Sequence, residues 1–166
     1  STQMDVIVRG VGGHGSRPED AKDPIVLAAN IVMQLQTIVS REVSPFDQAV
    51  VTVGTIQGGT KRNIIPEEVK LELNIRTYED SVRERVVQSV ARISRAAALG
   101  AGMPEDRLPI VKVIDTEYAP AVKNDPALTE RVAATFRRVL GPDAVVELPP
   151  VMGSEDFGQL GLNGEI

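Results

Sequence analysis

The residue of this chain best suited to chemistry is its only histidine, His14, which stands in the run Gly12-Gly13-His14-Gly15-Ser16-Arg17-Pro18. An imidazole on a loop bracketed by glycines can be presented to a ligand, or it can be an incidental polar side chain in solvent. A single imidazole cannot build a metal site by itself. The residue types alone therefore leave a ligand-contacting histidine and a solvent-exposed one as alternatives.

Two other polar segments contain side chains suited to binding or catalysis. Asn63 lies in the segment 60–66, TKRNIIP, where it could bind a ligand or form a turn with its own backbone. Glu155 lies in the segment 152–157, MGSEDF, where adjacent carboxylates could serve as acid, base or ligand. Neighbouring carboxylates rarely point at one target, and the segment is also typical of a helix start with Ser154 as the cap.

The composition is that of an ordinary globular protein and excludes several classes of function. Of the 166 residues, 42% are hydrophobic and 25% are charged, which is enough apolar material for a sizeable core. Aromatic residues make up 3%, tryptophan is absent and the net charge is −5, so we expect no nucleic-acid partner. No apolar run approaches the roughly 20 residues of a membrane span, so we expect no membrane partner. The absence of cysteine excludes disulfides and fits a reducing compartment, so we expect a cytoplasmic location.

Four segments have the alternation or the β-branched composition of strands. The clearest is 69–76, where apolar and polar residues alternate and Arg76 ends the polar face. The others are 4–9, 50–56 and 108–114. A guanidinium on that polar face could bind a carboxylate through two parallel hydrogen bonds, although a polar residue on the outer face of a sheet is more often simply solvated.

Two helices are expected between these strands. The first begins at Pro24 with Asp23 as its cap and runs to about Arg41. Its outer face carries amides in place of charges, so we expect part of it to be covered. The second begins with a capping box of Ser81 and Glu84 and ends near residue 100. The inward stripe of the first helix is expected to be Ile25, Ala28, Ala29, Val32, Leu35 and Val39, and that of the second Val82, Val86, Val90, Ile93 and Ala97.

The order of these elements is β-α-β-β-α-β. This order predicts an α+β fold of the ferredoxin-like type, in which an antiparallel sheet carries two helices on one face.

Beyond residue 116 the sequence changes character and predicts part of a second domain. A helix is expected from Pro126, capped by Asp125 and closed by Gly141-Pro142. A short strand is expected over 144–148, before the segment 152–157. The inward stripe of the helix is expected to be Leu128, Val132, Phe136 and Val139.

Four motifs, taken in order, resemble the M20 family of metallopeptidases and amidohydrolases, in its branch of N-acyl-amino-acid, hippurate and indoleacetyl-amino-acid hydrolases. They are the glycine-rich run around His14, Gly58-Gly59 followed by Asn63-Ile64-Ile65-Pro66, then Leu73-Asn74-Ile75-Arg76, and Met152-Gly153-Ser154-Glu155-Asp156-Phe157. The resemblance covers nearly the whole chain. It implies that residues 1–116 are the ferredoxin-like lid, or dimerisation domain, and that residues 117–166 are a partial segment of an α/β catalytic domain.

The resemblance also implies two divalent metal ions, zinc or manganese, in the full-length enzyme. In the family the metal ligands and the general-base glutamate precede the lid in sequence, and a further histidine ligand lies near the C-terminus. This chain contains neither segment. We therefore expect this fragment to bind no metal ion and to be inactive alone.

The resemblance assigns a role to each candidate residue. His14 matches the lid histidine that reaches the partner subunit's active site and stabilises the oxyanion formed when water attacks an amide carbonyl. Asn63 and Arg76 match lid residues that bind the carbonyl or carboxylate of the substrate, and Glu155 lies in a substrate-proximal segment. The implied partners are a small N-acyl amino acid or peptide substrate and a second copy of the chain, paired through the edge strand and helix of two lids.

The expected function is hydrolysis of the amide bond of N-acyl amino acids or similar small substrates by the full-length protein. The alternative is a non-catalytic ferredoxin-like module that binds a ligand or oligomerises, because the same topology serves both classes. Clustering of His14, Asn63 and Arg76 on one exposed surface would favour the enzyme, and scattering over opposite faces would favour the alternative.

Overall fold

The computed structural model describes residues 1–162. The chain forms two compact units, Ser1–Tyr118 and a second unit that begins at Ala119. No helix within the described residues is both long enough and apolar enough to cross a membrane.

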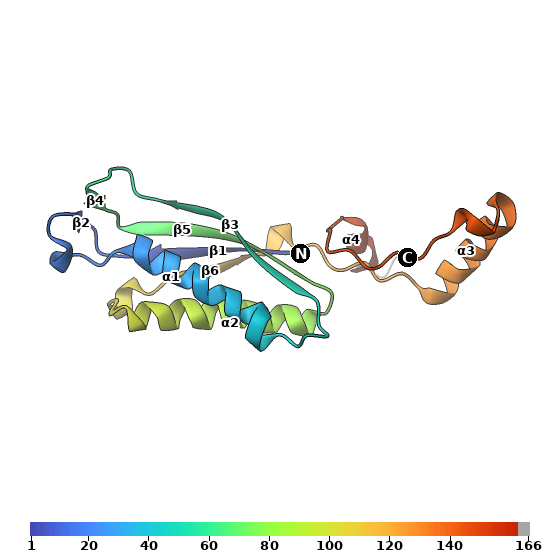
Figure 1. Cartoon of the computed structure of the whole chain (residues 1–166), viewed down its shortest axis with the longest axis horizontal. Helices are drawn as coiled ribbons and strands as arrows, with labels where there is room; N and C mark the ends of the chain where they lie inside the picture. Colours follow the sequence, from blue (N-terminus) through green and yellow to red (C-terminus); the bar gives the residue numbers. More distant parts are fainter. Residues whose placement is uncertain (163–166) are drawn as a thin grey trace. The chain divides into compact units, whose positions relative to one another are not determined.

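The first unit is built on a four-stranded antiparallel sheet (Figure 1). Its strands are β1 (Thr2–Arg9), β3 (Ala49–Gly58), β5 (Glu68–Thr77) and β6 (Ile110–Ile114), in the order β3-β5-β1-β6. Two helices, α1 (Pro24–Thr37) and α2 (Asp80–Gly100), pack on one face of the sheet. The predicted ferredoxin-like α+β fold is therefore confirmed.

Alternation of side chains along the two central strands builds the core of the first unit. All four residues predicted to share the inner face of β5 are buried, namely Val69, Leu71, Leu73 and Ile75. In β1, Met4 and Val6 are buried opposite Leu73 and Leu71. Complete burial of a large aliphatic side chain stabilises a fold by about 1.5–3 kcal/mol relative to exposure, so this shared face holds both helices to the sheet.

Helix α1 begins as predicted but turns a different face to the sheet. Asp23 Oδ1 accepts hydrogen bonds from the backbone N–H groups of Ile25 at 2.8 Å and Val26 at 3.4 Å. The buried residues are Pro24, Leu27, Ala28, Ile31 and Leu35. Three residues that we predicted to face inward are exposed, namely Ile25 (45%), Val39 (40%) and Ala29. This prediction was wrong because the helix is apolar almost all round, so hydrophobic periodicity does not single out one face.

A wider helical turn, Ile38–Glu42, continues from α1 and ties it to α2. The N–H of Val43 donates to the Ile38 carbonyl at 2.9 Å, five residues back, which is the pattern of a π-helix. Glu42 Oε2 accepts hydrogen bonds from Ser89 Oγ at 2.7 Å and from Arg92 Nη2 at 2.6 Å, both on α2. These bonds lower the pKa of the Glu42 carboxyl, with Arg92 the larger cause and Ser89 the next.

Helix α2 buries the predicted stripe of Val82, Val86, Val90, Ile93 and Ala97. The predicted capping box is wrong, because the helix already begins at Asp80 and Ser81 lies inside its first turn. Arg83 N–H donates to the Glu79 carbonyl at 3.0 Å, which starts the helical pattern before Ser81 can act as a cap.

Two features of the strands were not predicted. Strands β2 (Gly13–His14) and β4 (Ile64–Ile65) form a separate two-stranded antiparallel sheet. In β3 the register with β5 shifts between Val53 and Thr55, which marks a β-bulge.

Short 3₁₀ turns complete the unit at Pro18–Asp20, Glu105–Arg107 and Asp115–Glu117.

The second unit contains the helices α3 (Pro126–Leu140) and α4 (Phe157–Leu162). Asp125 caps α3 as predicted, with Oδ1 accepting from Leu128 N–H at 2.7 Å. The strand predicted over 144–148 is wrong, since Pro142–Ala144 form a 3₁₀ turn and residues 145–148 lie in no strand. A strand needs a neighbour to pair its backbone groups, and residues 119–162 include no strand that could pair with it.

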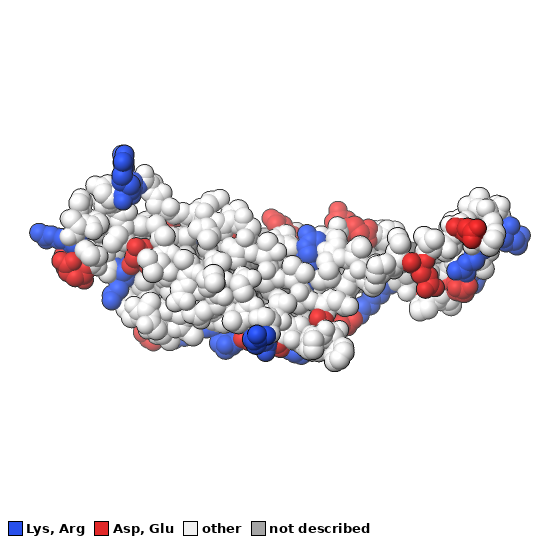
Figure 2. Space-filling model, viewed as in Figure 1, with Lys and Arg blue, Asp and Glu red and all other residues white. Residues whose placement is uncertain are grey.

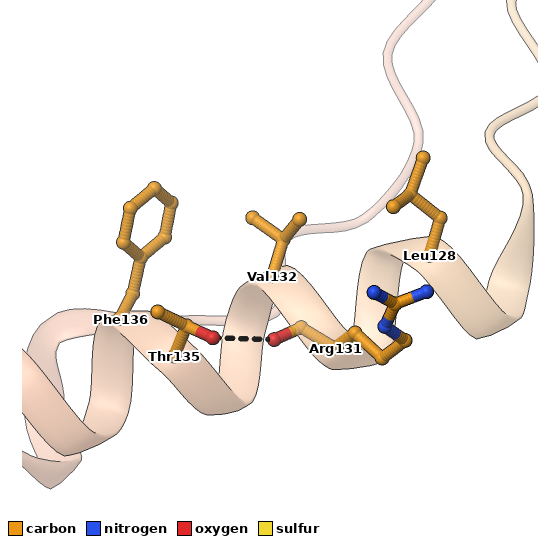
Figure 3. Close-up of a pocket in the computed structure, with 5 residues that line it drawn as sticks. All are labelled: Leu128, Arg131, Val132, Thr135 and Phe136. Carbon is orange, nitrogen blue, oxygen red and sulfur yellow. Dashed lines mark hydrogen bonds between the residues drawn. The ribbon is translucent and has the colours of Figure 1, made fainter.

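The predicted inward stripe of α3 does share one side of the helix. Figure 3 shows Leu128, Val132 and Phe136 pointing the same way, beside a hydrogen bond of 2.9 Å from Thr135 Oγ1 to the Arg131 carbonyl. These three apolar side chains are nevertheless 55%, 44% and 50% exposed, and Val139, the fourth residue of the predicted stripe, is 66% exposed. The expectation that they face inward is therefore wrong for the unit as described. The described residues of this unit leave an apolar helix face uncovered.

We expect Glu42→Gln to lower the free energy of unfolding by about 1 kcal/mol at neutral pH, because the amide loses the charge-assisted bonds to Arg92 and Ser89. The pKa of Glu42 is lower in the folded state than its ordinary 4.5, so the contribution is complete above about pH 4.5 and is lost as the pH falls through the lowered value. Urea unfolding of both proteins across this pH range measures the difference.

Glu84→Gln is the matched control, because Glu84 is an exposed carboxylate on α2, the helix that carries Ser89 and Arg92. It should leave the free energy of unfolding close to that of the wild type. A loss in Glu42→Gln that is as large in acid as at neutral pH would contradict an effect of the carboxylate charge.

Candidate functional site

The small sheet of β2 and β4 brings His14 next to Asn63, although 49 positions separate them in sequence. His14 pairs with Ile64, the residue after Asn63. The N–H of Gly15 donates to the Asn63 carbonyl at 2.8 Å, which extends the pairing by one residue. Glycine favours this close approach, because a Cβ at position 15 would lie 3.2 Å from that carbonyl oxygen, which is a tight contact.

The side chains of His14 and Asn63 are exposed, and Asn63 Nδ2 lies 3.5 Å from His14 Nε2. An amide N–H and an imidazole N–H at this separation can both donate to a single oxygen atom placed between them. Such a pair suits an oxygen that carries negative charge, such as a carboxylate or the oxyanion of a tetrahedral intermediate.

The other ring nitrogen of His14 contacts Ser16. Ser16 Oγ lies 2.7 Å from Nδ1, and the backbone N–H of Ser16 donates to the same nitrogen at 3.2 Å. The turn that contains both residues is closed by Arg17 N–H, which donates to the His14 carbonyl at 2.8 Å. Ser16 was not predicted as a site residue; its place two residues after a histidine in a tight turn is the signal that could have identified it.

The loops that carry this donor pair hold several cations. Arg17, Lys61 and Arg62 adjoin the pair in sequence, and all three are exposed. Figure 2 shows basic side chains, with acidic ones among them, at the end of the first unit where Figure 1 places β2 and β4. The acidic residues Glu19 and Asp20 partly offset the cations, and the balance next to His14 favours an anionic ligand.

Arg76 does not lie with His14 and Asn63. It stands near the end of β5, opposite Val50 of β3, and its Nε donates to Asn74 Oδ1 at 2.8 Å. Asn63 precedes the start of β5, so most of the strand separates the two, which is more than about 20 Å at 3.3 Å per residue. Within one chain, therefore, His14 and Asn63 lie together, whereas Arg76 lies apart from them.

Glu155 is exposed in the second unit. Its Oε2 accepts a hydrogen bond from Phe157 N–H at 3.2 Å, at the start of α4. The alternative interpretation of this segment was a helix start with Ser154 as the cap, and Glu155 makes the capping contact instead. A role for Glu155 in binding substrate stays a prediction.

A polar cluster on the open face of the main sheet has a structural explanation. Lys70 Nζ lies 2.6 Å from Glu72 Oε1 and 2.9 Å from Asp5 Oδ2, and Thr55 Oγ1 donates to Glu72 Oε2 at 2.8 Å. Glu72 and then Asp5 raise the pKa of Lys70, while Lys70 and then Thr55 lower the pKa of Glu72. Lys70 partly neutralises the two carboxylates, and the contacts join β5 to β1 and β3, which stabilises the sheet.

The described residues do not fit a metal centre. Residues 1–162 contain no group of three or more His, Cys, Asp or Glu side chains that could hold a metal ion. The side chains next to His14 are a hydroxyl and an amide, which cannot complete the ligand set of a zinc or manganese site. The two metal ions implied by the resemblance therefore have no site in this part of the chain.

Known proteins are similar to this chain over almost its whole length. N-acetyldiaminopimelate deacetylase of Leuconostoc citreum is 37% identical over 161 residues, which cover 96% of this chain and 40% of that protein. IAA-amino acid hydrolase ILR1-like 2 of Arabidopsis thaliana is 35% identical over 160 residues, which cover 93% of this chain and 34% of that protein. The structure of a protein assigned as an aminohydrolase from methicillin-resistant Staphylococcus aureus matches with a TM-score of 0.80 at 32% identity, covering 98% of this chain and 40% of that chain.

The chain thus spans 34% to 40% of the length of these relatives. A family model described as the peptidase dimerisation domain matches residues 1–101. This match covers more than half of the chain and includes His14, Asn63 and Arg76. The chain therefore belongs to the M20 peptidase family, whose dimerisation domain it contains.

Proposed function

We propose that residues 1–116 are the dimerisation lid, and residues 117–166 part of the catalytic domain, of a metal-dependent amidohydrolase that cleaves the amide bond of N-acyl amino acids or similar small substrates. The observation that carries this proposal is the donor pair of His14 Nε2 and Asn63 Nδ2, 3.5 Å apart on exposed loops. The names of two relatives support the reaction class, because a deacetylase and an amino acid conjugate hydrolase both break an N-acyl amide. The absence of cysteine supports a cytoplasmic location for this enzyme.

In this proposal His14 and Asn63 act on the carbonyl oxygen of the scissile amide. When water attacks the carbonyl carbon, that oxygen becomes an oxyanion and accepts a hydrogen bond from each side chain. One preorganised donor of this kind contributes about 3 kcal/mol to transition-state stabilisation. The two divalent metal ions, zinc or manganese, would be held by residues outside this chain.

The surface that we propose to contact a second copy of the chain is formed by α1 and the edge strand β3. No charged residue occurs from 24 to 40 or from 48 to 60. Val26 and Met33 of α1 are 66% and 71% exposed, and Ile56 of β3 is 55% exposed. Figure 2 shows a broad uncharged area where Figure 1 places these elements. The opposite edge strand, β6, is shorter and carries exposed Lys112, as edge strands that stay unpaired commonly do.

Pairing of two β3 edges about a twofold axis would bring Arg76 toward the His14–Asn63 pair of the partner. In an antiparallel pairing the start of one β3 meets the end of the other. Arg76 is the neighbour of Val50 near the start of β3, so it would lie about two strand spacings, roughly 10 Å, from the end of the partner's β3. That end leads directly to the loop that carries Asn63. A substrate held between two subunits would thus meet the donor pair of one and Arg76 of the other, whose fork suits a carboxylate.

The alternative, a non-catalytic ferredoxin-like module, is supported by the topology and by the distance of Arg76 from the other two residues within one chain. It does not account for the His14–Asn63 pair. It also does not account for a similarity to hydrolases that extends beyond the lid to 93% or more of the chain. These two observations favour the hydrolase.

In the full-length enzyme, His14→Ala should lower kcat on its best N-acyl amino acid substrate by about 10²–10³-fold, with a smaller change in KM. The reason is that an oxyanion donor acts mainly in the transition state. Steady-state kinetics measure both constants. A variant that kept the wild-type kcat would refute the proposed role of His14.

Mixing two defective variants tests whether each site is shared between subunits. His14→Ala and Arg76→Ala subunits are dissociated and allowed to recombine. Random pairing makes half of the dimers mixed, and each mixed dimer has one intact site of two, so about a quarter of the wild-type activity should return. Activity no higher than the sum of the separate variants would contradict a shared site.

Met33→Lys should convert the dimer to a monomer, because the interface would have to desolvate an unpaired ammonium. Met33 is 71% exposed, so the monomer should fold as before. Sedimentation velocity at fixed protein concentration measures the mass. Gln88→Lys, on the exposed side of α2, is the matched control and should leave the mass unchanged. A dimer that survives Met33→Lys would exclude pairing through α1.

A further inference from the structure

We propose that Arg107 is a positioning residue that holds the loops of His14 and Asn63 at the spacing that their joint action requires. This inference rests on the proposed function, because the spacing matters to the reaction only if both side chains act on one oxygen atom. Arg107 acts through these loops and is not itself a donor to the oxyanion.

The two loops leave the main sheet side by side. Gly10 follows β1 and begins the loop that carries His14. Glu67 precedes β5 and ends the loop that carries Asn63. The N–H of Gly10 donates to the Glu67 carbonyl at 2.7 Å. We call Gly10 and Glu67 the loop ends, because a movement at either of them displaces the side chains farther along its loop.

One guanidinium nitrogen of Arg107 bonds both loop ends. Nη1 donates to the Gly10 carbonyl at 3.2 Å and to Glu67 Oε2 at 2.9 Å. The second carboxylate oxygen of Glu67 lies close to the backbone of Gly12, since a Cβ at position 12 would be 3.0 Å from Oε1. Arg107 therefore restrains the loop of His14 both directly and through the Glu67 carboxylate.

The turn that carries Arg107 is fixed to the core of the first unit. Arg107 ends the 3₁₀ turn Glu105–Arg107, between α2 and β6. Met103 and Leu108, on either side of this turn, are 6% and 7% exposed. Arg9 of β1 adds a second connection, with Nε and Nη2 donating to the Leu108 carbonyl at 3.0 and 2.7 Å. A guanidinium carried by an anchored turn can restrain loops that are more exposed than itself.

The effect of Arg107 is expected to be local. The side chains of Arg107 and Glu67 are 39% and 64% exposed, and exposed ion pairs contribute little to the free energy of unfolding. A catalytic group, in contrast, must be held within about 0.5 Å of its productive position. Loss of the bonds from Arg107 should therefore impair the reaction more than it impairs stability.

Amide hydrogen exchange of this chain measures the positioning without the reaction. The reporter is the N–H of Gly15, which donates to the Asn63 carbonyl. The internal reference is the N–H of Leu71 in the middle of β5, whose exchange reports unfolding of the sheet. Arg107→Ala should raise the exchange rate of Gly15 about tenfold and leave that of Leu71 unchanged.

Arg92→Ala is the matched control variant, because it removes another exposed guanidinium that bonds a glutamate of the same unit, Glu42. It should leave the exchange rate of Gly15 unchanged. An unchanged Gly15 rate in Arg107→Ala would overturn the inference. An equal rise at Gly15 and Leu71 would overturn it too, because that pattern means general destabilisation.

In the full-length enzyme Arg107→Ala should lower kcat about tenfold with KM within about twofold, whereas Arg92→Ala should keep the wild-type kcat. Arg107→Lys should give an intermediate kcat, because an ammonium can donate to both loop ends but lacks the rigid guanidinium fork. A kcat in Arg107→Lys no higher than in Arg107→Ala would contradict a role for these bonds.

An unchanged kcat in Arg107→Ala, where His14→Ala is strongly impaired, would also overturn the inference. If His14→Ala itself kept full activity, the proposed function would fail. The exchange rate of Gly15 would still show whether Arg107 holds the two loops together.

Discussion

The main-chain hydrogen bond from Gly15 to Asn63, with the two-residue strands beside it, fixes the position of the two side chains that we propose as oxyanion donors. It joins two loops that leave the main sheet at one end, and it places an imidazole and an amide side by side. Backbone pairing is well suited to this task, because it positions each side chain through its Cα and leaves the polar atoms available for a ligand. The absence of a side chain at position 15 eases the approach, since a Cβ there would crowd the Asn63 carbonyl.

The length of the sheet imposes a second constraint. A strand of ten residues keeps Arg76 away from the donor pair of its own chain, yet puts it close to β3, which among the described residues pairs only with β5. The same rigid element that separates the groups within one subunit can therefore bring them together between two. Rigidity is useful here, because a donor that is held before the reaction needs no reorganisation during it.

Sequence patterns predicted the main sheet and the buried stripe of α2 because a period of two or of 3.6 residues is visible over many positions. They failed where no period exists. Strands β2 and β4 are too short to show one, and the almost wholly apolar α1 matches several phases equally well. The pairing of His14 with Asn63 followed from neither pattern, since it depends on backbone contacts between loops far apart in sequence. The roles predicted for these two residues came from the resemblance to a family. The strand predicted over 144–148 does not form. The segment has local β propensity but no neighbouring strand among the described residues, and propensity alone does not form a sheet.

The absence of charged residues along β3 affects the tendency of the protein to aggregate in the cell. Unpaired strand edges without charge or proline are templates for indiscriminate association, and natural sheets usually protect them. In the proposed dimer the protection is a partner subunit and not a gatekeeper residue, so it depends on mass action. In that dimer the edge is exposed only until two subunits pair, so rapid assembly would itself be a safeguard of solubility.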